Sequence, residues 1–401
     1  MGNLRMLFSS TKLPKFNTYA DFRRIARRRV PTMVFDFVDG GADGELTLDA
    51  NRRAFEQIVF EPRWMSDVSK IDLTTTVLGE QLSMPYLLAP AGLASVVHKD
   101  GELAVARAAA KANTIFCIST GSTYSLEEIA AAAPTAKLWF QLYLWKSEEV
   151  VSGLIQRAKA TGCRALVLTI DVPAVGKRER DLTNGMSLPP RIRPSNILDA
   201  AWRVRWLSHF ITGNEITFGN LRGIAAGDDA STVGEYTSRE LVDPSVTWER
   251  LDWLRRQWDG PLVIKGVLSV NDALECVRRG ADAVYVSNHG GRQLDSVSGA
   301  ASALPAIVDA VNGRAEIFVD GGVRRGEDVV KARALGATAA LSGRPWFFAL
   351  AADGQVGVER MLDIMRADIS RTLSLLGVPR FSDVNRSAIR PAAEPIQGGQ
   401  R

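Results

Sequence analysis

Cysteine and histidine are scarce in this 401-residue chain, which contains only three of each. The cysteines, Cys117, Cys163 and Cys276, lie far apart and form no CxxC pair, so we expect neither a disulfide framework nor a metal site. Cys117 and Cys163 sit in apolar runs, which favours buried core thiols over reactive ones.

Long apolar runs are also missing. No stretch approaches the roughly 18 apolar residues that a membrane-spanning helix needs, and the first residues show no secretory leader pattern. We therefore expect a cytoplasmic protein that is at most peripheral at the inner face of a membrane.

The excess of one charge sign is small. The chain has 49 basic and 45 acidic residues, mixed along its length, for a net charge of +4 and a pI near 9.0. This pattern argues against nucleic acid as a partner and suits small anionic substrates. Neither a P-loop motif nor a GxGxxG fingerprint follows a predicted strand, which argues against two common nucleotide-binding folds.

Short apolar runs bounded by turn residues recur along the chain, and helical patterns lie between most of them. These runs cover 85–92, 115–120, 138–144, 165–172, 262–267, 283–290, 316–322 and 339–346. Continuous rather than alternating apolar residues indicate parallel strands that are buried on both faces. Eight strand–helix units predict the α/β class and a TIM (β/α)₈ barrel, with an open doubly wound sheet as the alternative.

Three further segments complete the predicted organisation. Residues 1–84 form an N-terminal extension packed on the barrel, with helices at 19–29 and 31–39, and residues 386–401 form a flexible tail. The barrel spans 85–385. Within it, residues 185–245 belong to a long excursion after the fourth strand, which we expect to act as a lid or as a membrane-contacting loop.

Polar residues at the predicted strand ends suggest a catalytic site. VSNHGGRQLD (286–295) places His289 beside two glycines and close to Arg292, which suits a general base next to a carboxylate-binding guanidinium. Asp171 ends the fourth strand and could orient His289, although a helix N-cap is an alternative role. Lys265 ends the fifth strand, where it either faces solvent or lies inside the site.

Glycine-rich turns follow the last two predicted strands, at 320–326 and 342–346. Such turns in a barrel commonly bind phosphate through backbone N–H groups. Arg324 and Arg344 would add positive charge. From the residues alone, the chain is a barrel enzyme that binds a phosphate group and acts on a carboxylate, with His289 as base.

Several motifs together resemble those of the FMN-dependent α-hydroxy acid oxidoreductases, which include glycolate oxidase, lactate dehydrogenase and oxidase, and mandelate dehydrogenase. The resemblance covers residues 17–385, is closest to the mandelate and lactate dehydrogenase branch, and rests on FQLY, LTIDVP, GKRERD, IKG, SNHGGRQLD, DGGVRRG and SGRP.

The resemblance implies an FMN cofactor at the barrel mouth. The implied cofactor-binding residues are Pro90, Ala91, Gly92, Ser119, Gln141, Thr169, Lys265, Ser287, Asp320, Gly321, Gly322, Arg324, Gly343 and Arg344. The implied catalytic residues are His289 as base, Asp171 as its orienting partner and Lys265 near the flavin. The implied substrate-binding positions are Tyr143, Arg178, Arg292 and Phe37.

The implied reaction is oxidation of an (S)-2-hydroxy acid to the 2-oxo acid, by hydride transfer or through a carbanion. Electrons would then pass to a quinone, to oxygen or to another acceptor. The alternatives are a monooxygenase that decarboxylates the 2-hydroxy acid, and a flavin-binding protein with little turnover. The family resemblance also implies a homotetramer.

One residue departs from the family pattern. Phe37 stands in VFDFVDGGAD where the family usually has a tyrosine, so one hydroxyl for the substrate carboxylate is missing. Gly92 stands where many oxidases have a larger residue, which suggests extra room near the flavin. Phe37 indicates either a bulkier or less polar substrate or a compensating group from the long loop. Together with Gly92, it points to an aromatic or long-chain 2-hydroxy acid.

The stretch 197–213 combines aromatic and basic residues. Trp202 and Trp206 are four residues apart, with Arg203 and Arg205 beside them. A helix of this kind can lie in a membrane interface, as the resemblance to mandelate dehydrogenases implies. The alternative is that the tryptophans pack on the barrel as part of a lid.

Overall fold

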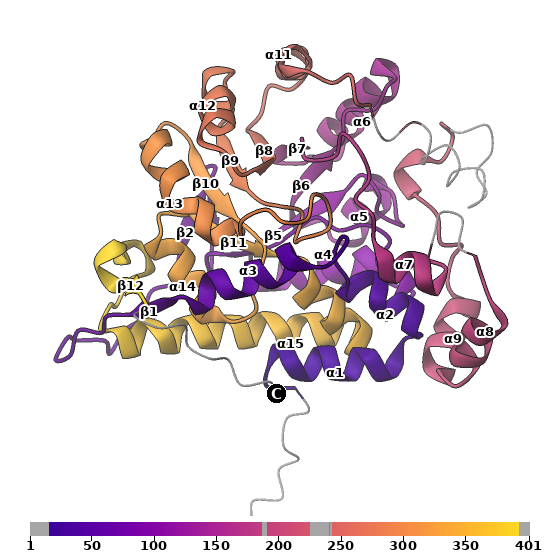
Figure 1. Ribbon diagram of the computed structural model, residues 1–401, viewed down its shortest axis with the longest axis horizontal. Helices are drawn as coiled ribbons and strands as arrows, with labels where there is room; N and C mark the ends of the chain where they lie inside the picture. Colours follow the sequence, from indigo (N-terminus) through magenta and orange to yellow (C-terminus); the bar gives the residue numbers. More distant parts are fainter. Residues whose placement is uncertain (1–15, 187–190, 225–239, 241–242, 393–401) are drawn as a thin grey trace, which may run out of the picture.

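Eight parallel strands close into a barrel in the computed structural model, which describes residues 16–186, 191–224, 240 and 243–392 (Figure 1). The strands are β4 (Tyr86–Leu88), β5 (Ile115–Ser119), β6 (Lys137–Leu142), β7 (Ala165–Thr169), β8 (Leu262–Val267), β9 (Ala283–Val286), β10 (Glu316–Val319) and β11 (Ala339–Ser342). Because β11 pairs with β4, the barrel prediction is confirmed and the open sheet is wrong. Most strands end earlier than predicted, since the polar and glycine residues after them form the loops of the barrel mouth.

A helix follows each strand and covers the outside of the barrel. These helices are α4 (Gly101–Ala112), α5 (Leu126–Ala132), α6 (Glu148–Ala160), α11 (Trp248–Gln257), α12 (Val270–Arg278), α13 (Ala300–Val311), α14 (Gly326–Ala334) and α15 (Arg344–Leu376). The long α15 is interrupted by non-helical backbone at Asp353 and Gly354.

The inside of the barrel is filled by side chains. Trp139, Tyr285, Phe318 and Cys117 belong to one fully buried cluster. The hairpin of β2 (Thr75–Val77) and β3 (Glu80–Leu82) adds apolar residues to this cluster. A ligand must therefore bind above the packed core, at the carboxyl ends of the strands. All three cysteines are buried, as predicted for Cys117 and Cys163.

The N-terminal extension packs on the barrel through α1 (Tyr19–Arg29), α2 (Thr32–Asp39), α3 (Leu46–Glu56) and β1 (Ile58–Phe60). The two predicted helices are confirmed, with Pro31 standing before the second as its N-cap. In Figure 1, α1 runs alongside α15. Residues 1–15 lie outside the described residues.

The chain is structured beyond the predicted end of the barrel. A 3₁₀ turn at Arg386–Ala388 leads into β12 (Ile389–Pro391), which pairs antiparallel with β1. The prediction of a flexible tail from residue 386 is therefore wrong for 386–391, because this segment completes a two-stranded sheet with the extension. The rest of that predicted tail, from residue 393, lies outside the described residues.

The excursion after β7 contains α7 (Glu179–Asn184), α8 (Pro194–Ala201), α9 (Val204–Thr212) and a 3₁₀ turn η2 (Gly219–Leu221). Its α8 and α9 lie beside α1 and α2 at the rim of the molecule (Figure 1). The Trp206 Nε1–H donates to the Val96 carbonyl at 2.7 Å, and Asp199 accepts from the Thr32 N–H at 2.6 Å.

The described part of the segment thus divides in two: η2 returns to the barrel mouth, whereas α8 and α9 lie at the rim. That 185–245 acts as a lid or as a membrane-contacting loop stays a prediction. Parts of this segment, at 187–190, 225–239 and 241–242, lie outside the described residues. Within the described ranges, no helix combines the length and the apolar character needed to cross a bilayer.

Candidate active site

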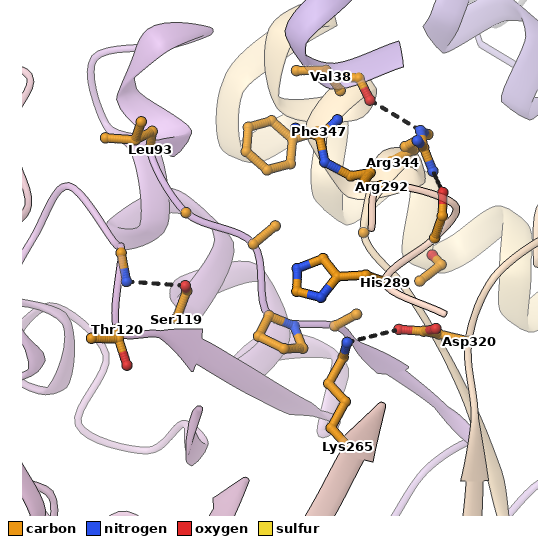
Figure 2. A pocket seen from close by; sticks show the side chains of 18 of the residues that line it. Val38, Leu93, Ser119, Thr120, Lys265, His289, Arg292, Asp320, Arg344 and Phe347 are labelled. Carbon is orange, nitrogen blue, oxygen red and sulfur yellow. Dashed lines mark hydrogen bonds and ion pairs between the residues drawn. The ribbon is translucent and has the colours of Figure 1, made fainter. Parts of the chain in front are cut away.

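A cavity of about 260 Å³ opens at the carboxyl ends of the strands. Figure 2 shows His289 projecting into it from one side, with Lys265 and Asp320 below and Ser119 opposite. The predicted site residues that line it are Phe37, Pro90, Ala91, Gly92, Ser119, Tyr143, Arg178, Lys265, His289, Arg292, Asp320, Gly321, Gly322, Arg324, Gly343 and Arg344.

His289 and Asp171 form a partly buried pair at the edge of the cavity. The His289 Nδ1 lies 3.0 Å from Asp171 Oδ1, and His289 itself adopts a left-handed backbone with φ of 58°. Asp171 reaches this position because Gly266 on β8 has no side chain: a Cβ there would stand 2.7 Å from the Asp171 Cβ and Cγ. The structure gives Asp171 this contact in place of the alternative N-cap role.

The electrostatics of this pair favour a neutral imidazole next to a carboxylate. Burial lowers the pKa of His289, although Asp171 opposes this effect. Burial alone would raise the pKa of Asp171, but His289 and Lys265 together hold it below its ordinary value. With Nδ1–H donated to Asp171, the Nε2 of His289 can accept a proton from the cavity.

Lys265 is buried at the end of β8, so the solvent-facing alternative is wrong: it is 4% exposed. Its Nζ lies 3.1 Å from the Ser287 hydroxyl and 3.9 Å from Asp320 Oδ2. Asp320 also accepts a hydrogen bond from the Tyr285 hydroxyl at 2.9 Å. A fixed positive charge therefore stands on the floor of the cavity.

Two arginines, Arg178 and Arg292, also line the cavity. The Arg292 guanidinium donates to the backbone carbonyls of Phe37 at 2.7 Å and Gly40 at 3.0 Å, so the end of α2 holds it in place. Arg178 is half-buried, and its buried Nε has no hydrogen-bond partner within the described residues. Burial lowers the pKa of Arg292 well below its ordinary value, and Arg178 adds to this effect. Asp181 offsets part of the effect at both arginines, but no carboxylate forms an ion pair with either of them among the described residues. Because incompletely neutralised cations are costly away from water, this wall suits an anionic ligand.

Tyr143 lies near both arginines, between the cavity and a second hollow of about 420 Å³. Burial raises the pKa of its phenol. The hydroxyl therefore stays protonated at neutral pH and can donate a hydrogen bond.

The loops after β10 and β11 form a backbone cradle. Gly321 and Gly322 have φ of 80° and 95°, and a Cβ on Gly322 would stand 2.1 Å from the Asn51 carbonyl oxygen. At Gly343 the nearest atom to such a Cβ is the Ala91 Cβ at 4.0 Å, so the space there is open. These loops can bring backbone N–H groups close to a phosphate.

Arg344 and Arg324 are partly committed to the protein backbone. Arg344 donates to the carbonyls of Val38, Gly290 and Gly40 at 3.0, 2.9 and 2.7 Å. Arg324 donates to the Val323 carbonyl at 2.8 Å. Burial lowers the pKa of Arg344 to about 10, and the nearby Arg324 contributes to this shift. The pair supplies positive charge beside the cradle and also holds α2 and the His289 loop in place.

Three of the predicted cofactor residues, Gln141, Thr169 and Ser287, are not in the cavity lining. The Gln141 Nε2 and the Thr169 Oγ1 are nevertheless buried without a hydrogen-bond partner in the described part of the chain. Ser287 is occupied by Lys265. Unpartnered polar atoms at the strand ends, a buried lysine and an open glycine cradle together fit a planar, polar and phosphorylated cofactor.

The structure corrects the interpretation of Gly92. A Cβ at this position would stand 2.4 Å from the Gly121 carbonyl oxygen. Gly92 therefore allows two loops to meet closely and does not leave spare room near a ligand.

Sequence reasoning missed the apolar part of the lining, which consists of Leu93, Trp145, Phe218, Leu221 and Phe347. Phe218 and Leu221 lie in the excursion after α9, where no periodic pattern marks them. The Phe218 ring fills the space beside Gly121, since a Cβ on Gly121 would lie 3.3 Å from it. Sequence reasoning also missed the buried amide pair of Asn51 and Asn288, which fixes α3 to the His289 loop at 2.8 and 2.9 Å.

Comparison with known proteins decides the family. Residues 26–391 match the family model described as FMN-dependent dehydrogenase. The chain belongs to this family. It is 41% identical over 373 residues to an L-lactate dehydrogenase from Pseudomonas syringae, covering 92% of this chain and 97% of that protein. It is also 40% identical over 374 residues to a glycolate oxidase from Arabidopsis thaliana, covering 92% of this chain and 95% of that protein.

Comparison with solved structures supports the same family assignment. A structure described as the monotopic membrane protein (S)-mandelate dehydrogenase superposes with a TM-score of 0.90 at 38% identity, covering 94% of this chain and all of that one. The protein is therefore an FMN-dependent oxidoreductase that oxidises 2-hydroxy acids.

Proposed function

We propose that this enzyme converts an (S)-2-hydroxy acid with a bulky apolar side chain to the 2-oxo acid, with His289 as the base. The observation that carries the proposal is the partly buried His289–Asp171 pair at the edge of the cavity. The neutral imidazole takes a proton from the substrate at Nε2, and Asp171 stabilises the imidazolium that results.

The substrate carboxylate pairs with Arg292 and Arg178, which lack a carboxylate counter-ion at hydrogen-bond distance among the described residues. Tyr143 supplies a hydroxyl on the same side of the cavity. This arrangement sets the 2-hydroxyl group near His289, because one bound carboxylate leaves the neighbouring carbon little freedom.

The family's FMN, when bound, would supply the acceptor for the two electrons that the substrate loses. In this proposal the Gly321–Gly322 and Gly343 loops hold its phosphate. Lys265 stabilises negative charge on the flavin, because its ammonium group is fixed and buried. Pro90, Ala91 and Ser119 lie along the facing wall.

The side chain of the substrate meets an apolar wall. Phe218, Leu221, Leu93 and Trp145 line this part of the cavity, and Phe37 brings a ring without a hydroxyl. Such a wall favours an aromatic or long-chain group over the methyl group of lactate. Among structural relatives, one is described as mandelate oxidase with (S)-4-hydroxymandelic acid, which is consistent with this preference.

The test is an anaerobic titration of the purified holoenzyme with glycolate, (S)-lactate, (S)-mandelate and 2-hydroxyoctanoate, followed by absorbance. We expect mandelate or 2-hydroxyoctanoate to bleach the flavin band at the lowest concentration. Preference for glycolate would contradict the proposed substrate class, and no bleaching by any of them would favour a flavin-binding protein with little turnover. Product analysis in air then separates a 2-oxo acid from the shortened carboxylic acid and CO₂ that a decarboxylating monooxygenase would release.

We also propose that α8 and α9 contact a membrane surface. Trp202, Val204 and Ile211 are 85%, 73% and 71% exposed, and Ile197 and Leu198 are exposed beside them. By contrast, Trp206 is half-buried against the barrel. An exposed apolar patch with neighbouring arginines suits an anionic bilayer interface, and it would favour a quinone as the electron acceptor.

Sedimentation with anionic phospholipid vesicles tests this contact. Trp202→Glu should lower the bound fraction several-fold, because a charge replaces the most exposed ring of the patch. Trp64 is 72% exposed and lies between β1 and β2, far from this patch in the sequence. Trp64→Glu is therefore the matched control. Equal binding by both variants would contradict the proposal.

The homotetramer stays a prediction, which light scattering can check.

A further inference from the structure

Asn220 is a fully buried polar residue that the proposed reaction does not use. It lies in η2 and is 0% exposed. Its side-chain Oδ1 accepts from the Leu126 N–H at 2.9 Å. Its Nδ2 donates to the Ser122 hydroxyl at 2.9 Å and also reaches the carbonyls of Thr120 and Ser119 at 3.2 and 3.3 Å.

These contacts join two segments that are far apart in the sequence. One is the return arm, which we define as residues 217–221 of the excursion, after α9. The other is the β5–α5 loop, residues 120–125. The Gly219 N–H donates to the Ser122 carbonyl at 2.9 Å, and a Cβ on Gly219 would stand 2.6 Å from the loop backbone. The return arm is therefore seated directly on the loop.

The joint has one further anchor. The Asn220 carbonyl accepts from Arg157 on α6 at 2.7 Å. Arg157 in turn forms a two-point ion pair with Glu127 on α5, at 2.7 and 2.8 Å. Asn220 thus stands where the return arm, the β5–α5 loop, α5 and α6 meet.

Both segments that this joint connects contribute residues to the cavity lining. On one side, Phe218 and Leu221 supply part of the apolar wall, and on the other side Gly121 lies under the Phe218 ring. A Cβ on Gly121 would stand 3.3 Å from the Phe218 ring, so the loop and the ring leave no room for an added methyl group, and a small shift of the return arm changes the width of the wall.

We propose that Asn220 is a positioning residue for substrate selection: it locks the return arm onto the β5–α5 loop and thereby sets the shape of the wall that meets the substrate side chain. This inference rests on the proposed function, because it assumes that the wall faces the side chain of a 2-hydroxy acid. Asn220 lies outside the cavity lining and contacts neither His289 nor Arg292, so its effect falls on selection among substrates and not on the proton transfer.

The test compares Asn220→Ala and Asn220→Asp with the wild-type holoenzyme. Asn220→Asp keeps the size and the acceptor but turns the Nδ2 donor into an oxygen that faces two carbonyls. A misplacement of about 1 Å in a bound group can change a rate about 100-fold. We expect both variants to lower kcat/KM for mandelate relative to glycolate by about 10-fold or more. The limiting rate of flavin bleaching with glycolate should stay within about twofold, since glycolate has no side chain on its α-carbon that could reach the wall.

Asn196→Ala is the matched control. Asn196 lies on α8 in the same excursion, and its side chain is bonded to Arg193 and Asn184 instead of to the β5–α5 loop. This variant should leave the ratio between the two substrates unchanged. A merely structural role for Asn220 would lower thermal stability without moving that ratio, and this outcome would overturn the proposal.

Hydrogen–deuterium exchange gives a second readout that does not depend on activity. In the Asn220 variants, peptides covering 120–126 and 214–224 should exchange faster than in the wild type and in Asn196→Ala. Unchanged exchange would overturn the positioning role, whatever the kinetics show. If none of the 2-hydroxy acids bleaches the flavin band of the wild-type enzyme, the proposed function fails. In that case the exchange result alone decides whether Asn220 holds the return arm.

Discussion

Replacing Phe37 by tyrosine should raise the affinity of this enzyme for its substrate carboxylate. Phe37 lies at the end of α2, and its ring centre is 5.2 Å from the Arg292 Cζ. Its backbone carbonyl also accepts from the Arg292 guanidinium at 2.7 Å. A hydroxyl on this ring would therefore enter the cavity beside the group that we expect to bind the carboxylate.

The size of the gain follows from the kind of bond that is added. A hydrogen bond to a charged group contributes about 1.5–3 kcal/mol, which corresponds to roughly 10- to 150-fold in a binding constant. The new hydroxyl costs little in the free enzyme, because the cavity is open to solvent. Since the carboxylate is present before and during the reaction, the gain should appear as a lower KM with kcat nearly unchanged.

Steady-state kinetics with glycolate and (S)-mandelate measure this effect. Tyr143→Phe is the matched control, because it removes one hydroxyl from the same cavity and should raise KM by a similar factor. The Phe37→Tyr, Tyr143→Phe double variant should lie between the two single variants. A KM for Phe37→Tyr within twofold of the wild type for both substrates would refute this placement of the carboxylate.

Three further predictions concern the catalytic pair, the cofactor cradle and a buried histidine. Asp171→Asn should keep bound FMN but slow flavin bleaching by about 10²- to 10⁴-fold in stopped-flow measurements, because the protonated His289 loses its counter-charge; an unchanged rate would contradict its role. Gly322→Ala should lower the FMN content of the purified protein, since its Cβ would stand 2.1 Å from the Asn51 carbonyl oxygen, and full FMN occupancy would contradict the cradle. Burial lowers the pKa of His98 from 6.5 to about 4. Between pH 6.5 and pH 4 the unfolded chain binds a proton at His98 that the folded chain does not bind. The free energy of unfolding, measured by urea denaturation, should therefore fall by up to about 2 kcal/mol between pH 7 and pH 5. His98→Gln should flatten that dependence, and an identical slope in this variant would exclude His98 as its source.

Much of the site could be predicted because barrel geometry gathers the strand ends. Continuous apolar runs marked the strands, and parallel closure then brings the residue after each strand to one mouth. This is why Asp171 and His289, 118 residues apart in the sequence, could be paired before their 3.0 Å contact was known. The burial of Lys265 follows from the same geometry.

The remaining features depend on contacts that no local pattern encodes. Gly92 looks like a source of free space, but the carbonyl of Gly121 on the next loop occupies that space. The β12 segment looks like a polar tail, and only its pairing with β1 makes it a strand. Phe218 and Leu221 enter the cavity because Asn220 seats the return arm on the β5–α5 loop, and a single asparagine in a loop gives no such signal in the sequence.

The central claim is that His289 takes the substrate proton, and His289→Gln tests it most directly. Glutamine is polar and close in size to histidine, but it cannot act as a base near neutral pH. Under anaerobic conditions the variant should bind FMN with an unchanged spectrum and bind the substrate. Its flavin band should then bleach at least about 100-fold more slowly than that of the wild type. Bleaching at the wild-type rate would contradict the account.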